Sequence, residues 1–204
     1  PGNTPPRFKS TAPRVAASAA LRHIAPMTAA RSNIVLIGMP GAGKSTVGSH
    51  LAERLGLGFT DTDALIETAQ GVSLQAIVDQ QGHQSLRTIE AALLAGLVCE
   101  RHVIATGGSA VYNAEAMAAL RHHGVIVHLH VELAVIAERV HNFESRGIAR
   151  AAGQTLAELY SERETLYQQY AEISVDLSEV DEAAAAPMIE QALSAAHLLP
   201  PALA

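Results

Sequence analysis

Cysteine and tryptophan are almost missing from this chain of 204 residues, which has one cysteine, Cys99, and no tryptophan. A single thiol excludes an internal disulfide framework and a zinc site built from cysteines. It is typical of a reducing compartment, so we expect the cytoplasm. No apolar run reaches the roughly 18 residues that a membrane helix needs, and we expect no membrane partner.

Basic residues are scarce beyond the first 31 positions. Residues 32–204 hold nine of the 14 basic residues and all 20 acidic ones. A protein that binds nucleic acid needs a basic face, so we expect no nucleic-acid partner. Lys44 is the only lysine in this part, which makes the positions of its few cations informative.

The first 31 residues differ in composition from the rest. They are rich in Pro, Ala, Ser and Arg and contain no Asp or Glu. We predict that residues 1–31 are disordered, either as a transit peptide or as a non-native segment upstream of a start at Met27. Residues 32–204 have the length of one domain.

Short apolar strands alternate with helical stretches from Asn33 onward. The predicted strands cover 34–37, 57–60, 102–105, 125–129 and 173–176. The predicted helices cover 44–55, 64–70, 73–81, 83–100, 113–123, 132–139, 156–170 and an Ala-rich stretch near the end. This alternation predicts an α/β fold, a five-stranded parallel sheet with helices on both faces. Ligands bind beyond the carboxyl ends of such strands.

A glycine-rich segment follows the first predicted strand. It reads Gly38-Met39-Pro40-Gly41-Ala42-Gly43-Lys44-Ser45 and matches the phosphate-binding G-x-x-x-x-G-K-[ST] loop. Its backbone N–H groups and the next helix N-terminus attract phosphate, Lys44 adds a charge, and the Ser45 hydroxyl suits Mg²⁺. The predicted ATP contacts are Gly38, Gly41, Ala42, Gly43, Lys44, Ser45 and Thr46.

Two carboxylates, Asp61 and Asp63, follow the second predicted strand. One carboxylate at this place can hold Mg²⁺ through water, and the other can accept a proton from a substrate hydroxyl. Asp61 is the better candidate for the metal side. The alternative is that one of them only caps the next helix.

Several other residues have both a functional and a purely structural interpretation. Arg87 and Glu90 have helical i, i+3 spacing and can form an ion pair. Gly107 and Gly108 follow a strand and allow a ligand to approach the backbone. We predict a mobile lid at about 140–153, because Arg139, Arg146 and Arg163 on and around this polar loop suit phosphate or carboxylate groups.

The remaining polar and aromatic residues favour structural roles. The ten histidines show no metal-ligand spacing, and we expect His122, His123, His128 and His130 to be exposed or structural. Tyr160, Tyr167 and Tyr170 share one helical stripe and predict packing. Cys99 is expected late in an apolar helix.

Taken together in their order, these motifs resemble the shikimate kinase family over about residues 33–176. The resemblance rests on the phosphate loop, on Phe59-Thr60-Asp61-Thr62-Asp63, on Leu86-Arg87-Thr88-Ile89-Glu90, on Thr106-Gly107-Gly108-Ser109 and on the spacing of Arg139, Arg146 and Arg163. It implies a P-loop NTPase fold like that of nucleoside-monophosphate kinases, and an enzyme that phosphorylates the shikimate 3-hydroxyl with Mg²⁺ and ATP. Separately, we expect a monomer.

The resemblance also implies a role for each matching residue. Lys44, Asp63 and Arg146 would be catalytic. Asp63 would also bind the substrate hydroxyls, and Asp61 would hold Mg²⁺ through water. Arg87, oriented by Glu90, and Arg163 would bind the carboxylate of the substrate. The remaining implied contacts are Gly107 and Gly108 to the substrate and Arg139 to adenine.

Three segments depart from the family pattern. The chain has Gly107-Gly108-Ser109 where the family has three glycines, Gly82-His83 in place of Gly-Glu, and Arg146-Gly147-Ile148-Ala149 in place of R-P-L-L. Two alternatives to shikimate phosphorylation therefore stay open. One is a kinase for another small hydroxylated carboxylic acid, and the other is a silent, kinase-like ligand sensor.

Overall fold

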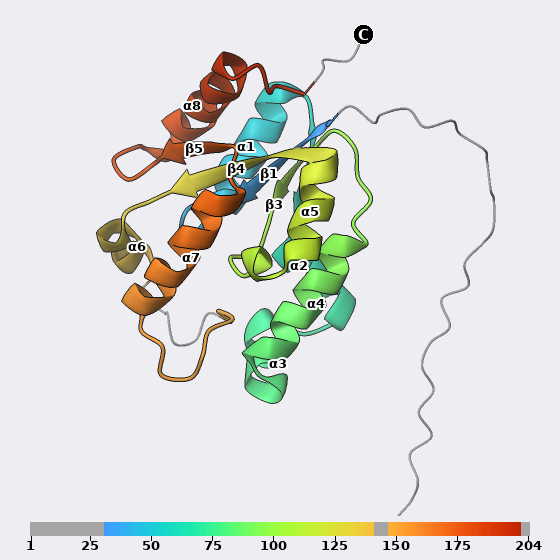
Figure 1. Ribbon diagram of the computed structural model, residues 1–204, viewed down its shortest axis with the longest axis vertical. Helices are drawn as coiled ribbons and strands as arrows, with labels where there is room; N and C mark the ends of the chain where they lie inside the picture. Colours follow the sequence, from blue (N-terminus) through green and yellow to red (C-terminus); the bar gives the residue numbers. More distant parts are fainter. Residues whose placement is uncertain (1–30, 141–146, 201–204) are drawn as a thin grey trace, which may run out of the picture.

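The strands form one parallel sheet. The computed structural model describes residues 31–140 and 147–200, and its sheet has five strands in the order β2-β3-β1-β4-β5 (Figure 1). The strands are β1 (Asn33–Ile37), β2 (Gly58–Asp61), β3 (His102–Ala105), β4 (Gly124–His130) and β5 (Ile173–Asp176). The α/β class, the strand count and the parallel pairing predicted from the sequence are confirmed.

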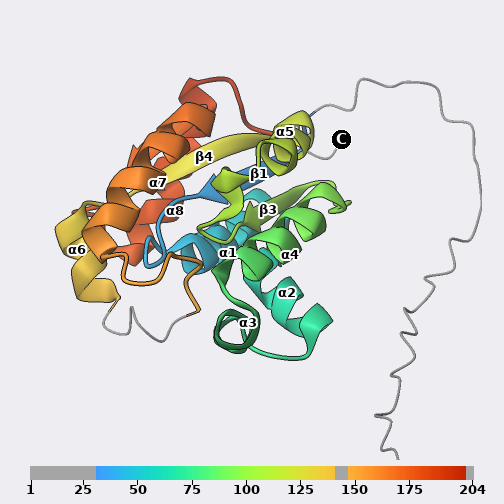
Figure 2. The same ribbon diagram turned by 60° about the horizontal axis from the view of Figure 1, so that its bottom comes forward.

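Helices cover both faces of this sheet (Figures 1 and 2). α1 and α8 pack together on one face, and α5 and α7 cover the other. The bounds are α1 (Lys44–Leu55), α2 (Thr62–Gln70), α3 (Leu74–Gln81), α4 (His83–Ala95), α5 (Ala114–His123), α6 (Leu133–Arg139), α7 (Leu156–Tyr170) and α8 (Glu182–Ala195), with a 3₁₀ turn, η1, at Ala110–Tyr112. No helix in the described part is both long and apolar enough to cross a membrane.

The centre of the core is β1, which is buried along its whole length. Its β-branched and leucine side chains lie between the helices of both faces, as a fully covered parallel strand requires. β4 beside it is buried from Gly124 to Leu129. Because both faces are covered, the carboxyl edge of the sheet is left for a ligand.

The predicted helix over 83–100 is wrong at its end. α4 stops at Ala95, where the Gly96 N–H bonds back to the carbonyls of the last turn. The apolar stripe extends past the end of the helix to Leu97, because the side chain of Leu97 packs on the core from the turn that follows. Cys99 accordingly lies in the link to β3, and its carbonyl accepts a bond from Asn33 Nδ2 (2.9 Å).

Residues 1–30 of the predicted tail and residues 141–146 of the predicted lid lie outside the described residues. The predicted boundary of the disordered segment is wrong by one residue, Arg31. Its guanidinium donates to the Gly124 carbonyl (2.9 Å) and pairs with Glu172. Residues 147–153 carry no helix or strand, as the loop prediction requires.

We expect Asn33→Ala to destabilise the fold by about 2 kcal/mol. The Asn33 side chain is 2% exposed and joins the starts of two strands by bonds to Cys99 O and from His102 N, both 2.9 Å. The substitution leaves both backbone groups without this partner. Urea denaturation measures the loss. Arg54→Gln, which removes an exposed ion pair with Glu190 (2.6 Å), should cost less than about 1 kcal/mol. Equal losses would contradict the role given to Asn33.

Candidate active site

The glycine-rich loop between β1 and α1 forms the floor of the main cavity at the carboxyl edge of the sheet. Gly41 and Gly43 have φ of 87° and 86°, a left-handed conformation that favours glycine. A Cβ at Gly41 would also lie 2.7 Å from Val140 Cγ2. No side chain caps α1, so its first N–H groups remain available for an anion.

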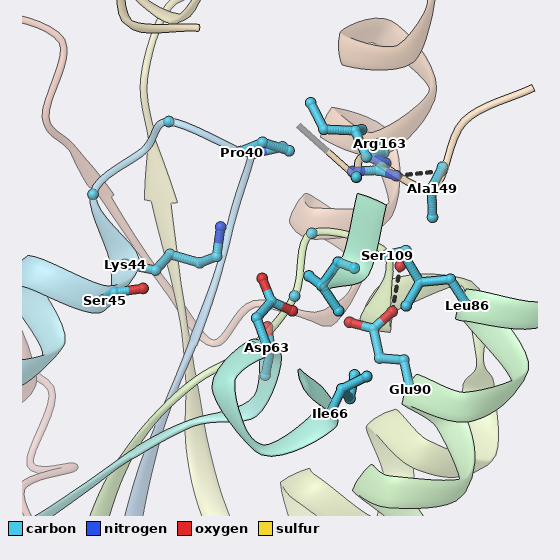
Figure 3. A pocket seen from close by; sticks show the side chains of 18 of the residues that line it. Pro40, Lys44, Ser45, Asp63, Ile66, Leu86, Glu90, Ser109, Ala149 and Arg163 are labelled. Carbon is cyan, nitrogen blue, oxygen red and sulfur yellow. Dashed lines mark hydrogen bonds between the residues drawn. The ribbon is translucent and has the colours of Figure 1, made fainter. Parts of the chain in front are cut away.

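Lys44 is buried within this loop. Its Nζ donates to the carbonyl oxygens of Gly38 (2.8 Å) and Met39 (2.9 Å). Burial lowers the pKa of Lys44 to about 8, and the nearby Asp63 carboxylate opposes that shift. Lys44 forms no ion pair among the described residues. Its side chain points into the cavity (Figure 3). A phosphate there would supply the missing counter-charge.

The cavity has a volume of about 340 Å³ and lies at the carboxyl edge of the sheet. Segments far apart in the sequence line it: the phosphate loop, α2, α4, the turn after β3, residues 147–149 and α7. The predicted site residues that line it are Gly41, Gly43, Lys44, Ser45, Thr46, Asp63, Gly107, Gly108, Arg139 and Arg163. A smaller cavity of about 240 Å³ adjoins it at Gly41, Gly43, Thr46 and Arg139.

The two carboxylates after β2 lie differently. Asp63 lines the cavity and points toward Lys44 (Figure 3). Asp61 instead caps α2, where its Oδ1 accepts bonds from the N–H groups of Asp63 (2.9 Å) and Ala64 (3.3 Å). The capping alternative therefore holds for this oxygen of Asp61. The metal role of Asp61 stays a prediction.

The glycines after β3 leave room for the acidic groups. A Cβ at Gly107 would lie 2.6 Å from Asp63 Oδ1, and one at Gly108 would lie 2.8 Å from Arg163 Nη1. Neither position accepts a side chain without moving a charged group. The Gly108 carbonyl accepts a bond from the Tyr167 hydroxyl (2.8 Å), so Tyr167 holds this turn as well as packing in the core.

Glu90 does not pair with Arg87, so that prediction is wrong. Its Oε2 accepts a hydrogen bond from Ser109, and its Oε1 has no hydrogen-bond partner among the described residues (Figure 3). Burial raises the pKa of Glu90 to about 7, and the Ser109 hydrogen bond opposes the rise. Glu90 lines the cavity, whereas Arg87 does not.

Two arginines converge on one backbone oxygen. Arg163 is 1% exposed, and its Nη2 donates to the Ala149 carbonyl at 2.8 Å. Arg87 Nη2 donates to the same oxygen at 3.2 Å. The Arg87 guanidinium stacks 3.6 Å from the centre of the Tyr112 ring and borders a neighbouring cavity with it. Arg87 thus reaches the edge of the main cavity rather than its lining, and Arg146 lies outside the described residues.

The family model for shikimate kinase matches residues 40–194. The chain belongs to the shikimate kinase family. Its relatives in this family include the shikimate kinase of Neisseria meningitidis serogroup C (strain 053442), which is 38% identical over 146 residues, 70% of this chain and 86% of that protein. The shikimate kinase of Thermobifida fusca (strain YX) is 40% identical over 79% of this chain and 95% of that protein.

Solved structures agree with this family assignment. The shikimate kinase from Acinetobacter baumannii, in complex with shikimate, has a TM-score of 0.75 at 32% identity and covers 82% of this chain and 95% of that one. A deoxyadenosine kinase from M. mycoides, at 14% identity and a TM-score of 0.54, shares the fold. The predicted family and fold, that of P-loop kinases, are confirmed.

Sequence reasoning missed three features of this shikimate kinase family member. They are the stacking of Tyr112 on Arg87, the Ser109–Glu90 hydrogen bond and a cluster of His128, His130 and Glu164. Each joins segments that lie 19 to 36 positions apart, so local spacing gives no signal. Ser109, which stands where the family has a third glycine, was the one sequence signal that indicated an additional polar contact.

Glu90 predicts a pH dependence of stability. Its folded pKa of about 7 lies above the usual 4.5, so the folded protein holds a proton that the unfolded chain releases between these values. Stability should therefore fall as pH rises through this window. Relative to the wild type, Glu90→Gln should gain roughly 2–3 kcal/mol between pH 5 and pH 8 in urea denaturation.

Ser109→Ala is the matched variant for this test. It removes the hydrogen bond that lowers the pKa of Glu90, so the loss of stability should move to higher pH. A difference between wild type and Glu90→Gln that stays constant with pH would refute the burial of a titrating Glu90.

Proposed function

We propose that this protein transfers the γ-phosphoryl group of ATP to the 3-hydroxyl of shikimate. One observation carries the proposal: a single cavity holds a lysine on a phosphate loop, a carboxylate and a buried arginine, namely Lys44, Asp63 and Arg163. Phosphate binding, proton acceptance and anion binding are the three tasks that phosphorylation of a hydroxylated acid needs. The A. baumannii relative holding shikimate supports this choice of acceptor.

In the proposed reaction, the shikimate hydroxyl oxygen bonds to the γ-phosphorus as the bond to the β-phosphate oxygen breaks, and ADP leaves. Asp63 accepts the hydroxyl proton, and Lys44 balances the charge on the phosphates together with the backbone N–H groups of the loop. Arg139, which lines both the main and the smaller cavity, suits the adenine side of ATP. Gly107 and Gly108 place bare backbone beside the acceptor.

Mg²⁺ is part of the proposal because the oxygen donors present suit a hard cation. Ser45 offers an exposed hydroxyl at the start of α1 and lines the same cavity as the Asp63 carboxylate (Figure 3). The second carboxylate oxygen of Asp61 would reach the ion through water. When bound, Mg²⁺ neutralises phosphate charge.

Arg163 and Arg87 form the proposed carboxylate site. Two guanidinium groups already share the Ala149 carbonyl oxygen, which shows that a single oxygen can accept from both. A substrate carboxylate oxygen, being fully charged, would be the stronger acceptor at this place. The catalytic role of Arg146 rests on the family resemblance alone.

A monomer in the cytoplasm completes the proposal. The residues of one chain line the whole cavity, so a partner chain is not needed to build it. Cys99 is a free thiol, which suits a reducing compartment.

The test is release of ADP from Mg²⁺-ATP with and without shikimate. We expect turnover that depends on shikimate, and we expect Lys44→Met to abolish it while the CD spectrum stays unchanged. Turnover only with another hydroxylated acid would assign the second acceptor class. Binding of shikimate without any turnover would favour a sensor.

Arg163→Ala should raise the KM for shikimate about tenfold to hundredfold and change the KM for ATP less than about twofold. The reason is the loss of a charged hydrogen bond to the acceptor carboxylate. Steady-state kinetics measures both constants. Arg163→Lys keeps the charge and should recover part of the affinity.

Arg139→Ala is the reciprocal control. It should raise the KM for ATP and leave the KM for shikimate nearly unchanged, because Arg139 lies beside the phosphate loop. If Arg139→Ala raised the KM for shikimate, or Arg163→Ala raised the KM for ATP, the assignment of the ATP and shikimate sites would be wrong.

A further inference from the structure

A cluster of two histidines and a glutamate lies between the sheet and α7. His128 and His130 are alternate residues of β4 and so point to the same face of the sheet. Glu164 on α7 faces both rings. Its Oε1 lies 3.0 Å from His130 Nδ1, and its Oε2 lies 3.5 Å from His128 Nε2.

The ligand atoms of these three residues have the spacing of a metal site. One nitrogen of each ring and one carboxylate oxygen all lie within 4.8 Å of one another. Two imidazole nitrogens and a carboxylate oxygen are a common ligand set for Zn²⁺, which leaves a fourth position for water. His130 is 29% exposed and Glu164 15%, so an ion can reach them from solvent.

The surroundings hold the first ring ready to bind. The Ser174 hydroxyl lies 3.4 Å from His128 Nδ1, on the side away from Glu164. Such a contact orients a ligating histidine and leaves its Nε2 for an ion. The ring also stacks on Tyr167, with 5.2 Å between the ring centres.

Charge on this face also favours a cation. Asp176 is the register partner of His130 on β5 and lies near the His130 ring. Together with Glu164 it places two carboxylates beside two imidazoles. Lys44, Arg139 and Arg163 line the main cavity, and the His128–His130–Glu164 cluster does not.

We propose that His128, His130 and Glu164 bind one divalent transition-metal ion of the zinc type, which joins β4 to α7 outside the ATP site. Glu164 directly follows Arg163 in α7, so the ion would fasten the helix that carries the buried arginine of the cavity. This proposal does not depend on the acceptor of the kinase reaction. Without an ion, the same groups would form only a hydrogen-bonded cluster.

The test is titration of the full, untagged protein with Zn²⁺ and with Co²⁺ in the absence of nucleotide. We expect one equivalent to bind, a Co²⁺ absorption spectrum of tetrahedral type, and a rise in Tm of about 5 °C at saturating Zn²⁺. Excess Mg²⁺ should not displace the ion, because the site has two nitrogen ligands.

Two variants test the assignment of ligands. His130→Gln and Glu164→Gln should each weaken Zn²⁺ binding at least tenfold and abolish the Co²⁺ spectrum. Both side chains are partly exposed, so these variants should fold, as the CD spectrum will show. The matched control is His122→Gln with His123→Gln, which changes an adjacent pair at the end of α5 and should leave binding unchanged.

Absence of saturable binding to the wild type would overturn the proposal and leave a hydrogen-bonded cluster. Equal loss of binding in the His122 and His123 control would overturn it too, because the ion would then bind exposed histidines. Zn²⁺ binding that is retained in both His130→Gln and Glu164→Gln would also overturn the proposal.

Discussion

The parallel pairing of β3 with β1 and with β2 places the groups of the cavity that directly follow these strands. Leu36 is paired with Ala105 and Ile37 with His128, and Asp61 is paired with Ala105 from the other side of β3. The strands therefore end at nearly the same level. The phosphate loop, the start of α2 and the glycine turn after β3 all leave the sheet at this edge, and the hydrogen bonds of the ladder fix their separation.

Burial of charge is the second constraint, and it acts against stability. Lys44, Glu90 and Arg163 all lie within the fold with little exposure. Removing such groups from water is costly unless each finds a partner, and here the arginine and the lysine bond mainly to backbone carbonyls. The large aliphatic core around β1 stabilises the domain enough to tolerate these groups.

Much of the fold could be predicted from sequence because its signals are local. The glycine loop, the β-branched runs and the apolar helical stripes placed five strands and most helices correctly. The end of α4 was missed because a core-facing stripe continues past Gly96 without a helix. Lys44 and Asp63 were predicted at one edge of the sheet because their motifs follow the ends of parallel strands, and Arg163 was added by the family resemblance. All three line one cavity.

Contacts between distant segments could not be predicted in this way. Arg87 and Glu90 have the spacing of an ion pair, but Arg87 stacks on Tyr112 and Glu90 accepts a hydrogen bond from Ser109 instead. The spacing of His128 and His130 on a strand places them on one face, but only the packing of α7 brings Glu164 to them. Such contacts depend on the angle of a helix over the sheet, which no local pattern encodes.

The shared Ala149 oxygen has a consequence for selectivity. Because this carbonyl accepts one N–H from each arginine, a ligand oxygen that takes its place exchanges one acceptor for another at these two donors. At these two donors the gain in binding free energy comes from the difference between a neutral and a charged oxygen. An ester or amide of the same molecule has a neutral oxygen like that of Ala149 and would gain little by replacing it. The contact with Ala149 therefore favours binding of anions over binding of their neutral analogues.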